Sequence, residues 1–220
     1  MELDATDIFV LGSGGHARVL LDLLSLAHPE WRVAILELDR SLHGSTVMGV
    51  EVVGGDELMQ EIARINLCAR FTVGVGTVRD SGPRRRLFQR GLASGLPPQT
   101  LIHPSAVASR FASVGLGAQL LSSCVVNTGA VIGMNVVVNS GAVVEHDCVV
   151  KGHAHIASGA CIAAEVTVGA GAHVGAGASV RQGLNIGDGA VVGVGAAVVR
   201  DVLPGDVVIG VPARPYSEWT

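Results

Sequence analysis

A six-residue repeat decides the fold of most of this chain. Residues 162–197 read IAAEVT-VGAGAH-VGAGAS-VRQGLN-IGDGAV-VGVGAA, and Val or Ile opens every hexad. The register runs from Ala108 to Val198, and 15 of its 16 lead positions hold Val, Ile or Leu. A small or aliphatic residue recurs four positions after each lead residue, as at Ala172 and Ala178. Such a sustained short period is typical of a solenoid, in which each repeat packs on its neighbours.

The hexad pattern predicts a parallel β-helix with three flat faces. The lead aliphatic residue points inward, the small residue fits where the chain turns a corner, and glycine tolerates the backbone angles needed there. Three hexads complete one coil, so residues 18 apart in the sequence lie one above the other. They pair as parallel strands about 4.8 Å apart. We expect this all-β domain over residues 99–220.

The first 98 residues follow a different pattern, in which short apolar runs alternate with amphipathic segments. This alternation predicts a small Rossmann-like α/β domain over residues 1–98, with a parallel sheet. The expected strands and helices are, in order, strand 7–11, helix 18–27, strand 32–38, helix 55–65, strand 71–75 and helix 79–92. The cluster Arg84-Arg85-Arg86 falls on the last of these helices, where we expect it to form a solvated surface.

A glycine-rich segment joins the first expected strand to the first expected helix. Residues 12–17 read GSGGHA, which fits the dinucleotide-binding fingerprint. Its glycines allow backbone N–H groups and a helix start to approach a phosphate. Glu37 and Asp39, at the end of the second expected strand, could meet a ribose hydroxyl. Because the domain is about half the size of a full dinucleotide fold, one nucleotide diphosphate is a more plausible ligand than NAD.

Composition excludes several classes of partner. The net charge is −4 and the chain has a single lysine, Lys151, so no basic surface for nucleic acid is expected. Glycine interrupts the apolar runs, so no membrane span is expected. The acidic N-terminus and the unpaired spacing of the four cysteines favour a cytoplasmic protein with reduced thiols. Charged residues are scarce in the repeat region, which predicts that the β-helices bury their faces in a homotrimer.

The sequence around His146 is suited to general base catalysis. His146 lies outside both inward registers of the repeat, between Glu145 and Asp147, whose carboxylates would raise the pKa of the imidazole. Neighbouring strand residues face opposite ways, so adjacency alone leaves open whether Asp147 contacts His146. The alternative is a histidine on the surface without a catalytic role.

Two further histidines, His155 and His173, are 18 residues apart and should stack in adjacent coils. Zinc would need three convergent ligands. The close His-x4-His spacing of β-helix carbonic anhydrases is absent, so no metal is expected.

The whole chain resembles the family of sialic acid O-acetyltransferases and amino-sugar N-acetyltransferases of the NeuD/PglD type. Five motifs carry the resemblance: Gly12-Ser13-Gly14-Gly15-His16, Gly54-Gly55-Asp56, Ile102-His103-Pro104-Ser105-Ala106, Asn139 to Asp147, and Ile209-Gly210-Val211-Pro212-Ala213-Arg214. The resemblance implies a left-handed β-helix, acetyl-coenzyme A as cosubstrate and His146 as the catalytic base, assisted by Asp147.

The resemblance also implies the remaining binding residues. Cofactor positions fall on His155, Ala164, Ala176 and Val194. Beside the resemblance, one of His155 and His173 could donate a hydrogen bond to the thioester carbonyl, while the other lines the cofactor groove or, for His173, lies solvated at the edge. Arg214 could pair with a phosphate of coenzyme A or could be a surface charge. Substrate positions fall on Gly14, Gly15, His16, Glu37, Gly76 and Asn139.

The predicted activity is N-acetylation of a nucleotide-linked amino sugar in bacterial surface-glycan biosynthesis, by direct attack of the amine on the thioester. The near alternative is O-acetylation of sialic acid or a related sugar. A zinc hydratase of the carbonic anhydrase kind and a noncatalytic β-helix scaffold are the distant alternatives.

Overall fold

The computed structural model describes residues 3–77 and 80–218, which form two compact units. Unit 1 contains the chain up to Gly76 together with Pro83–Thr100, and unit 2 contains Thr77–Gly82 together with the chain from Leu101 onward. Thr77 and the described residues 80–82 therefore belong with the repeat region, although they interrupt the N-terminal domain in the sequence.

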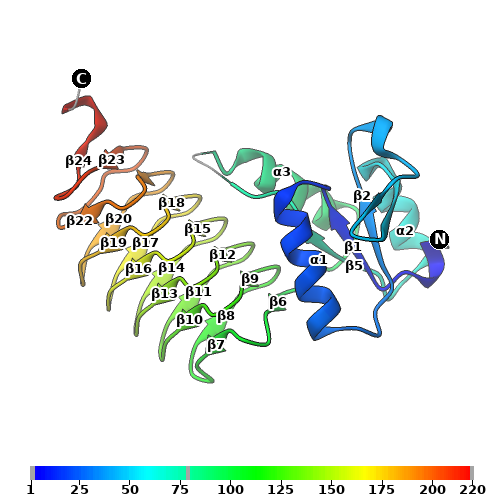
Figure 1. Ribbon diagram of the computed structural model, residues 1–220, viewed down its shortest axis with the longest axis horizontal. Coiled ribbons are helices and arrows are strands. Elements are labelled where there is room, and N and C mark those ends of the chain that lie inside the picture. Colours follow the sequence, from blue (N-terminus) through cyan, green and yellow to red (C-terminus); the bar gives the residue numbers. More distant parts are fainter. Residues whose placement is uncertain (1–2, 78–79, 219–220) are drawn as a thin grey trace. The chain divides into compact units, whose positions relative to one another are not determined.

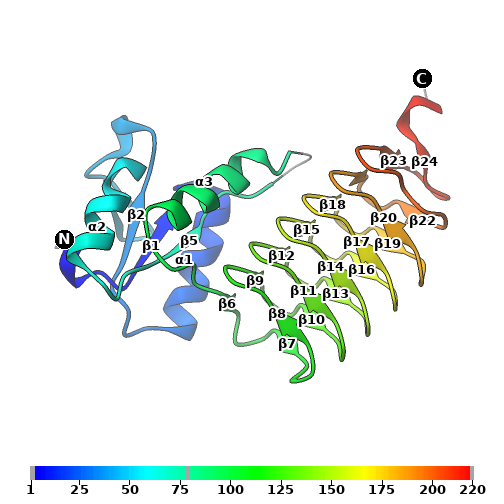
Figure 2. The ribbon, with the colours of Figure 1, turned by 180° about the vertical axis from the view of Figure 1, so that it is seen from behind.

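Unit 1 is a five-stranded sheet with helices on both faces. The strands are β1 (Ile8–Leu11), β2 (Val33–Leu36), β3 (Thr46–Val47), β4 (Val50–Gly54) and β5 (Arg70–Val73), in the spatial order β3-β4-β2-β1-β5. The helices are α1 (Gly15–Ala27), α2 (Met59–Ile65) and α3 (Gly82–Ala93), with short 3₁₀ turns at Leu3–Ala5, Arg40–Leu42 and Asp56–Leu58. Figures 1 and 2 show α1 on one face of the sheet and α2 and α3 on the other.

The sheet is parallel except for one edge strand. A parallel sheet was predicted from the alternation of strands and helices in the sequence. β1, β2, β4 and β5 run parallel, and all four residues of β1 are buried, as expected for a central strand covered on both faces. β3 pairs with β4 in an antiparallel hairpin that the sequence analysis did not predict. Its two turn residues, Met48 and Gly49, both have positive φ, which is typical of a two-residue hairpin turn.

Unit 2 is a β-helix of short strands, nearly all of two residues, arranged in three sheets, which we call faces 1, 2 and 3. Face 1 contains β6 (Leu101–Ile102), β9 (Gln119–Leu120), β12 (Val137–Val138), β15 (His155–Ile156), β18 (His173–Val174), β21 (Val191–Val192), β23 (Val207–Ile209) and the antiparallel β24 (Arg214–Pro215). Face 2 contains β7 (Val107–Ala108), β10 (Val125–Val126), β13 (Val143–Val144), β16 (Cys161–Ile162), β19 (Ser179–Val180) and β22 (Ala197–Val198). Face 3 contains β8 (Ser113–Val114), β11 (Val131–Ile132), β14 (Val149–Val150), β17 (Thr167–Val168) and β20 (Asn185–Ile186).

The predicted repeat is confirmed in register and in packing. Up to the last coil, each strand pairs with the strand 18 residues further on, as β13 does with β16, where Val144 lies beside Ile162. In the last coil the spacing shortens to 16 residues, and Val191 of β21 lies beside Val207 of β23. The lead aliphatic residues and the small residues that follow them form one continuous buried column. The thiols of Cys124 and Cys148 lie in this column, so they pack as small apolar groups. Figure 1 shows the coils in single file, and a 3₁₀ turn at Tyr216–Glu218 follows the last strand.

The corners of the β-helix explain the glycine in the repeat. In the hexads that open at Val114 to Val192, the fourth residue adopts a positive φ, and glycine holds most of these positions, as at Gly141 (φ 67°) and Gly177 (φ 66°). A positive φ is costly for other residues. The exceptions in the β-helix are Ser123, Asn135, Asp147, His153 and Glu165.

One expectation about unit 1 is wrong. The sequence pattern predicted a solvated surface for Arg84, but its side chain is only 1% exposed. Its Nη1 group donates to the carbonyl oxygens of Val73 and Val75, both at 2.9 Å. Arg85 and Arg86, in contrast, are exposed. Because one face of α3 lies on the sheet, the first arginine of the cluster points inward and the next two point outward.

Within the part of the chain that the structure describes, none of the helices combines the length and the apolar character that crossing a bilayer requires.

Candidate active site

The corner between faces 2 and 3 carries His146 and Asp147, directly after β13. The imidazole Nδ1 of His146 lies 2.8 Å from Oδ2 of Asp147. The turn makes this contact possible: Asp147 has a φ of 58°, so the two neighbours are not on opposite sides of an extended strand. The question that strand geometry left open is thus answered by the corner conformation. The side chain of His146 is exposed, and its second ring nitrogen, Nε2, is the one that does not contact Asp147.

Three carboxylates influence His146. The hydrogen bond with Asp147 raises the pKa of His146, partial desolvation opposes it, and the negative charges of Asp147, Glu145 and Glu165 add to the rise. Glu165 lies one coil above Asp147, and its backbone N–H donates to the carbonyl of His146 at 3.1 Å. Glu145 is held by the amide of Asn127 at 3.0 Å. The imidazole is therefore oriented by one carboxylate and made more basic by all three.

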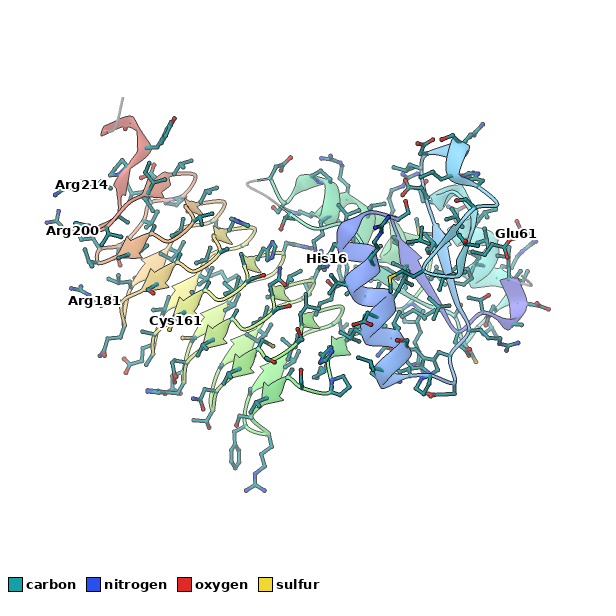
Figure 3. The ribbon with its side chains drawn as sticks, viewed as in Figure 1. His16, Glu61, Cys161, Arg181, Arg200 and Arg214 are labelled. Carbon is teal, nitrogen blue, oxygen red and sulfur yellow. The ribbon has the colours of Figure 1, made fainter. Side chains whose placement is uncertain are left out.

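The same corner continues toward the C-terminal end of the β-helix. Ala164 lies one coil above His146, and Arg200 lies two coils beyond Ala164, after β22. Arg181 follows β19 on the same corner. Arg214 is close by, because the N–H of Ala213 donates to the carbonyl of Ala197 in β22. In Figure 3, Arg181, Arg200 and Arg214 project from the same side of the β-helix. We call these three residues the arginine cluster.

The other predicted cofactor positions lie elsewhere on the prism. Ala176 and Val194 occupy the corner between faces 1 and 2, one coil apart, where the N–H of Gly195 donates to the carbonyl of Ala176. His155 and His173 lie on face 1, paired in register, with ring centroids 5.0 Å apart in an edge-to-face arrangement. A single chain therefore does not bring all the predicted cofactor residues together.

Both ring nitrogens of His155 have partners within unit 2, and the side chain is 7% exposed. Nδ1 is 2.8 Å from both the carbonyl oxygen and the hydroxyl of Thr77. Nε2 is 3.2 Å from the amide nitrogen of Asn139, whose Oδ1 accepts from the N–H of Ser140 at 2.8 Å. A carbonyl only accepts and an amide NH₂ only donates, so Nδ1 carries the proton and Nε2 accepts. Asn139, predicted to bind substrate, thus contacts His155.

His173 has a different environment from its neighbour. It is half-buried, and this burial lowers the pKa of its imidazole, so the neutral form is favoured. The predicted roles of His155 and His173 toward a cofactor stay predictions.

Five of the six predicted substrate residues line one cavity in unit 1. This cavity of about 200 Å³ is bounded by Gly14, Gly15, His16, Glu37 and Gly76, and also by Ser13, Asp56 and Leu87. It lies at the carboxyl ends of β1, β2 and β5. The chain runs from β1 outward to β2 and later returns to the other side of β1 as β5, so this is the point where the strand order reverses. Ligands bind at such points in parallel α/β sheets.

The carboxylate of Glu37 lines the cavity and is hydrogen-bonded to the glycine-rich loop. Its Oε2 accepts from both the N–H (2.8 Å) and the hydroxyl (2.6 Å) of Ser13. Burial would raise the pKa of Glu37, but these bonds and one from the N–H of Asp39 lower it on balance. The carboxylate is therefore ionised at neutral pH and holds the loop in place. Sequence reasoning did not anticipate Ser13 or Thr77, because each meets its partner only through the fold.

No group of three or more His, Cys, Asp or Glu side chains that could hold a metal ion occurs in residues 3–77 and 80–218.

Known structures resemble this chain over nearly its whole length. No protein-family model and no curated protein matches the sequence. Solved structures do match. The acetyltransferase domain of PglB from Neisseria gonorrhoeae, in complex with acetyl-coenzyme A, is 32% identical, with 94% of this chain and 98% of that chain covered and a TM-score of 0.85.

Two further solved structures extend the comparison. PerB from Caulobacter crescentus, in complex with coenzyme A and GDP-perosamine, is 33% identical, with 94% and 96% of the two chains covered and a TM-score of 0.86. WeeI from Acinetobacter baumannii is 25% identical, with 96% and 99% covered and a TM-score of 0.82.

The fold and these similarities define an acyltransferase built on a left-handed hexapeptide-repeat β-helix. The chain belongs to the NeuD/PglD-type family of sugar acetyltransferases.

Proposed function

We propose that this protein transfers an acetyl group from acetyl-coenzyme A to the amine of a nucleotide-linked amino sugar, with His146 as the general base. The observation that carries the proposal is the 2.8 Å contact between His146 Nδ1 and Asp147 on an exposed corner of the β-helix. The structures of PglB and PerB, which hold acetyl-coenzyme A and coenzyme A with GDP-perosamine respectively, support this cosubstrate and this class of acceptor.

The chemistry needs only one proton acceptor from the protein. Asp147 engages Nδ1 of His146, so Nε2 is the atom that takes a proton from the attacking amine. The new C–N bond forms as the C–S bond of the thioester breaks, and the proton passes to the departing thiolate or to water. No covalent enzyme intermediate is required, since the thioester is already activated. The buried Cys124 and Cys148 are consistent with this, because burial raises the pKa of both thiols.

The corner between faces 2 and 3 provides a track of suitable length for coenzyme A. His146 and Arg200 are three coils apart, which corresponds to about 14 Å at a coil spacing of about 4.8 Å. This is the length scale of an extended pantetheine arm. We propose that the acetyl group lies near His146, the arm passes Ala164, and the phosphates meet the arginine cluster, where guanidinium groups can hold them by charge-assisted hydrogen bonds.

The nucleotide of the acceptor is proposed to occupy the cavity of unit 1. Gly14 and Gly15 open α1, where backbone N–H groups and the helix dipole favour a phosphate. Neither glycine has another atom within 4 Å of where a Cβ would lie, so there is room for a ligand at the loop. His16 and Gly76 would contact the same ligand.

We further propose a homotrimer. Ala164, Ala176 and His173 lie on different corners and faces of one prism, so one chain cannot surround a cofactor with all of them. A second β-helix packed alongside the first would bring a corner of one next to a face of the other. Light scattering at micromolar concentration tests this: a mass of three chains is expected, and a stable monomer contradicts it.

A thiol-release assay tests the proposed activity. Purified protein is incubated with acetyl-coenzyme A and a panel of nucleotide-linked amino sugars and free sialic acids, and free thiol is measured. Release is expected with one or more nucleotide amino sugars, with N-acetylation verified by mass spectrometry. Release with sialic acids alone would instead assign O-acetylation, and release with neither would contradict both.

A further inference from the structure

A buried arginine lies against the wall of the nucleotide cavity. Arg84 is the largest fully buried side chain of the described residues, with 1% of its surface exposed. Burial lowers the pKa of its guanidinium to about 9, so the group stays charged at neutral pH. Burying a cation is costly unless the fold gives it specific partners. A residue of this kind therefore calls for a physical explanation.

Two of the groups that Arg84 contacts are backbone carbonyls at the end of β5. Nη1 donates to the carbonyl oxygens of Val73 and Val75, each at 2.9 Å. β5 is the edge strand of the sheet, and the segment beside it reaches only as far as Phe71, through Pro97 and Gln99. Beyond that point Arg84 takes the place that a further strand would occupy.

The backbone that Arg84 holds is the same backbone that bounds the cavity. Gly74, Val75 and Gly76 all line it, and Leu87, one turn further along α3, lines it as well. This wall is tightly placed: a Cβ on Gly74 would lie 2.7 Å from Val10 Cγ1 and 2.9 Å from the Cβ of Ala17 in α1. Small movements of the wall are therefore transmitted to the start of α1.

The described side chains that line the cavity carry negative charge and include no lysine or arginine, so the nearby Arg84 is a candidate source of positive charge. Two carboxylates, Glu37 and Asp56, are among the described residues that line it, whereas none of those residues is lysine or arginine. Asp56 forms an ion pair with Arg90, and Glu37 is engaged by Ser13. A nucleoside diphosphate is strongly anionic and needs positive potential at its site.

We propose that Arg84 is a positioning residue for the nucleotide diphosphate: it fixes the wall formed by Gly74, Val75 and Gly76 and supplies positive charge from beneath that wall. This inference rests on the proposed function, because it assumes that the cavity takes a nucleotide. A buried charge is screened less than a surface charge, so it acts more strongly through the low-dielectric backbone. Because Nη1 is held by two backbone carbonyls, we infer that Arg84 acts from a fixed position.

Calorimetric titration with uridine diphosphate and guanosine diphosphate tests the inference on the full-length protein. The variants are Arg84→Met, which removes the charge, Arg84→Gln, which removes the charge but keeps an amide donor, and Arg84→Lys, which keeps the charge. Arg85→Met is the matched control, because it removes an exposed charge one residue along the same helix.

We expect both neutral Arg84 variants to bind at least about tenfold more weakly, equivalent to about 1.4 kcal/mol. Arg84→Lys should retain most of the affinity, and Arg85→Met should bind as the unmodified protein does. In turnover, the KM for the nucleotide sugar should rise in the neutral variants, while the KM for acetyl-coenzyme A stays unchanged. A merely structural role would lower the melting temperature without this selective change.

The possible failures are distinguishable. If the unmodified protein binds a nucleotide and a folded Arg84→Met or Arg84→Gln binds it equally well, the role of Arg84 is overturned and the proposed function stands. If the unmodified protein binds neither nucleotide, the proposed role of the cavity fails and the inference fails with it.

Discussion

His146 and Asp147 form a hydrogen-bonded pair although they are adjacent in sequence, with Nδ1 and Oδ2 2.8 Å apart. Adjacent residues of an extended strand cannot do this, because their side chains point to opposite faces. The pair forms here because Asp147 occupies the left-handed position of a β-helix corner, at φ 58°. An orienting carboxylate is thus provided within one turn of the chain.

Replacing His146 tests its role directly. His146→Ala should lower kcat by about 10²- to 10⁴-fold, the range for loss of a general base, with little change in stability because the side chain is exposed. The thiol-release assay measures this. His103→Ala serves as a control in the first coil, and it should keep full turnover. Near-full turnover in His146→Ala would remove His146 from the mechanism.

The pH dependence follows from the carboxylates around His146. The base must be neutral to accept a proton. The value of kcat should therefore be low at pH values below the pKa of His146 and should rise as the pH increases through that pKa. Asp147 raises that pKa, chiefly through its hydrogen bond. In Asp147→Asn the pKa should fall, so the rise of kcat should move to lower pH while its plateau decreases, because a weaker base remains. A rise at unchanged pH would mean that another group titrates.

Asp147 also allows stability to be separated from activity. Its positive φ is the conformation that glycine holds at most equivalent corners, for example at Gly141. Asp147→Gly should therefore leave the free energy of unfolding unchanged or raise it by up to about 1 kcal/mol. It should also reduce kcat, because the carboxylate is lost. Unfolding followed by circular dichroism, together with turnover, tests both. A large loss of stability would show that Asp147 has a structural role.

Two glycines beside the cavity should respond oppositely to alanine. In Gly74→Ala the new Cβ would lie 2.9 Å or less from Val10, Ala17 and the carbonyl of Gly12, so we expect a loss of about 1–3 kcal/mol in stability. Gly14→Ala meets no atom within 4 Å and has an ordinary φ of −73°. It should remain stable but bind nucleotide more weakly, because the methyl group occupies ligand space. Equal stability of the two variants would contradict the packing argument.

The arginine cluster predicts a selective effect on coenzyme A. The double variant Arg200→Gln/Arg214→Gln should raise the KM for acetyl-coenzyme A by about tenfold, about 1.4 kcal/mol, and weaken its salt dependence. Arg110→Gln, at the opposite end of the β-helix, is the control. Comparison with acetyl-dephospho-coenzyme A identifies the phosphate involved. An unchanged KM would place the phosphates elsewhere.

The sequence by itself determined the β-helix and much of its site. Successive coils pair residues 18 apart, so the stacking of His155 on His173 and the exposed position of His146 follow from counting. Cys124 and Cys148 could be assigned to the core in the same way. In a solenoid each contact partner lies a fixed number of residues away, so local pattern and tertiary structure carry the same information.

Only the tertiary structure decided the features that depend on contacts outside the regular repeat. The burial of Arg84 against Val73 and Val75, the β3–β4 hairpin, and the bonds from His155 to Thr77, 78 residues earlier, have no signature in the repeat. In the α/β unit, the packing of α3 on the sheet decides which arginine points inward. At the corner, the left-handed turn decides that Asp147 meets His146. Burial and pairing there result from distant segments meeting, which spacing along the chain does not encode.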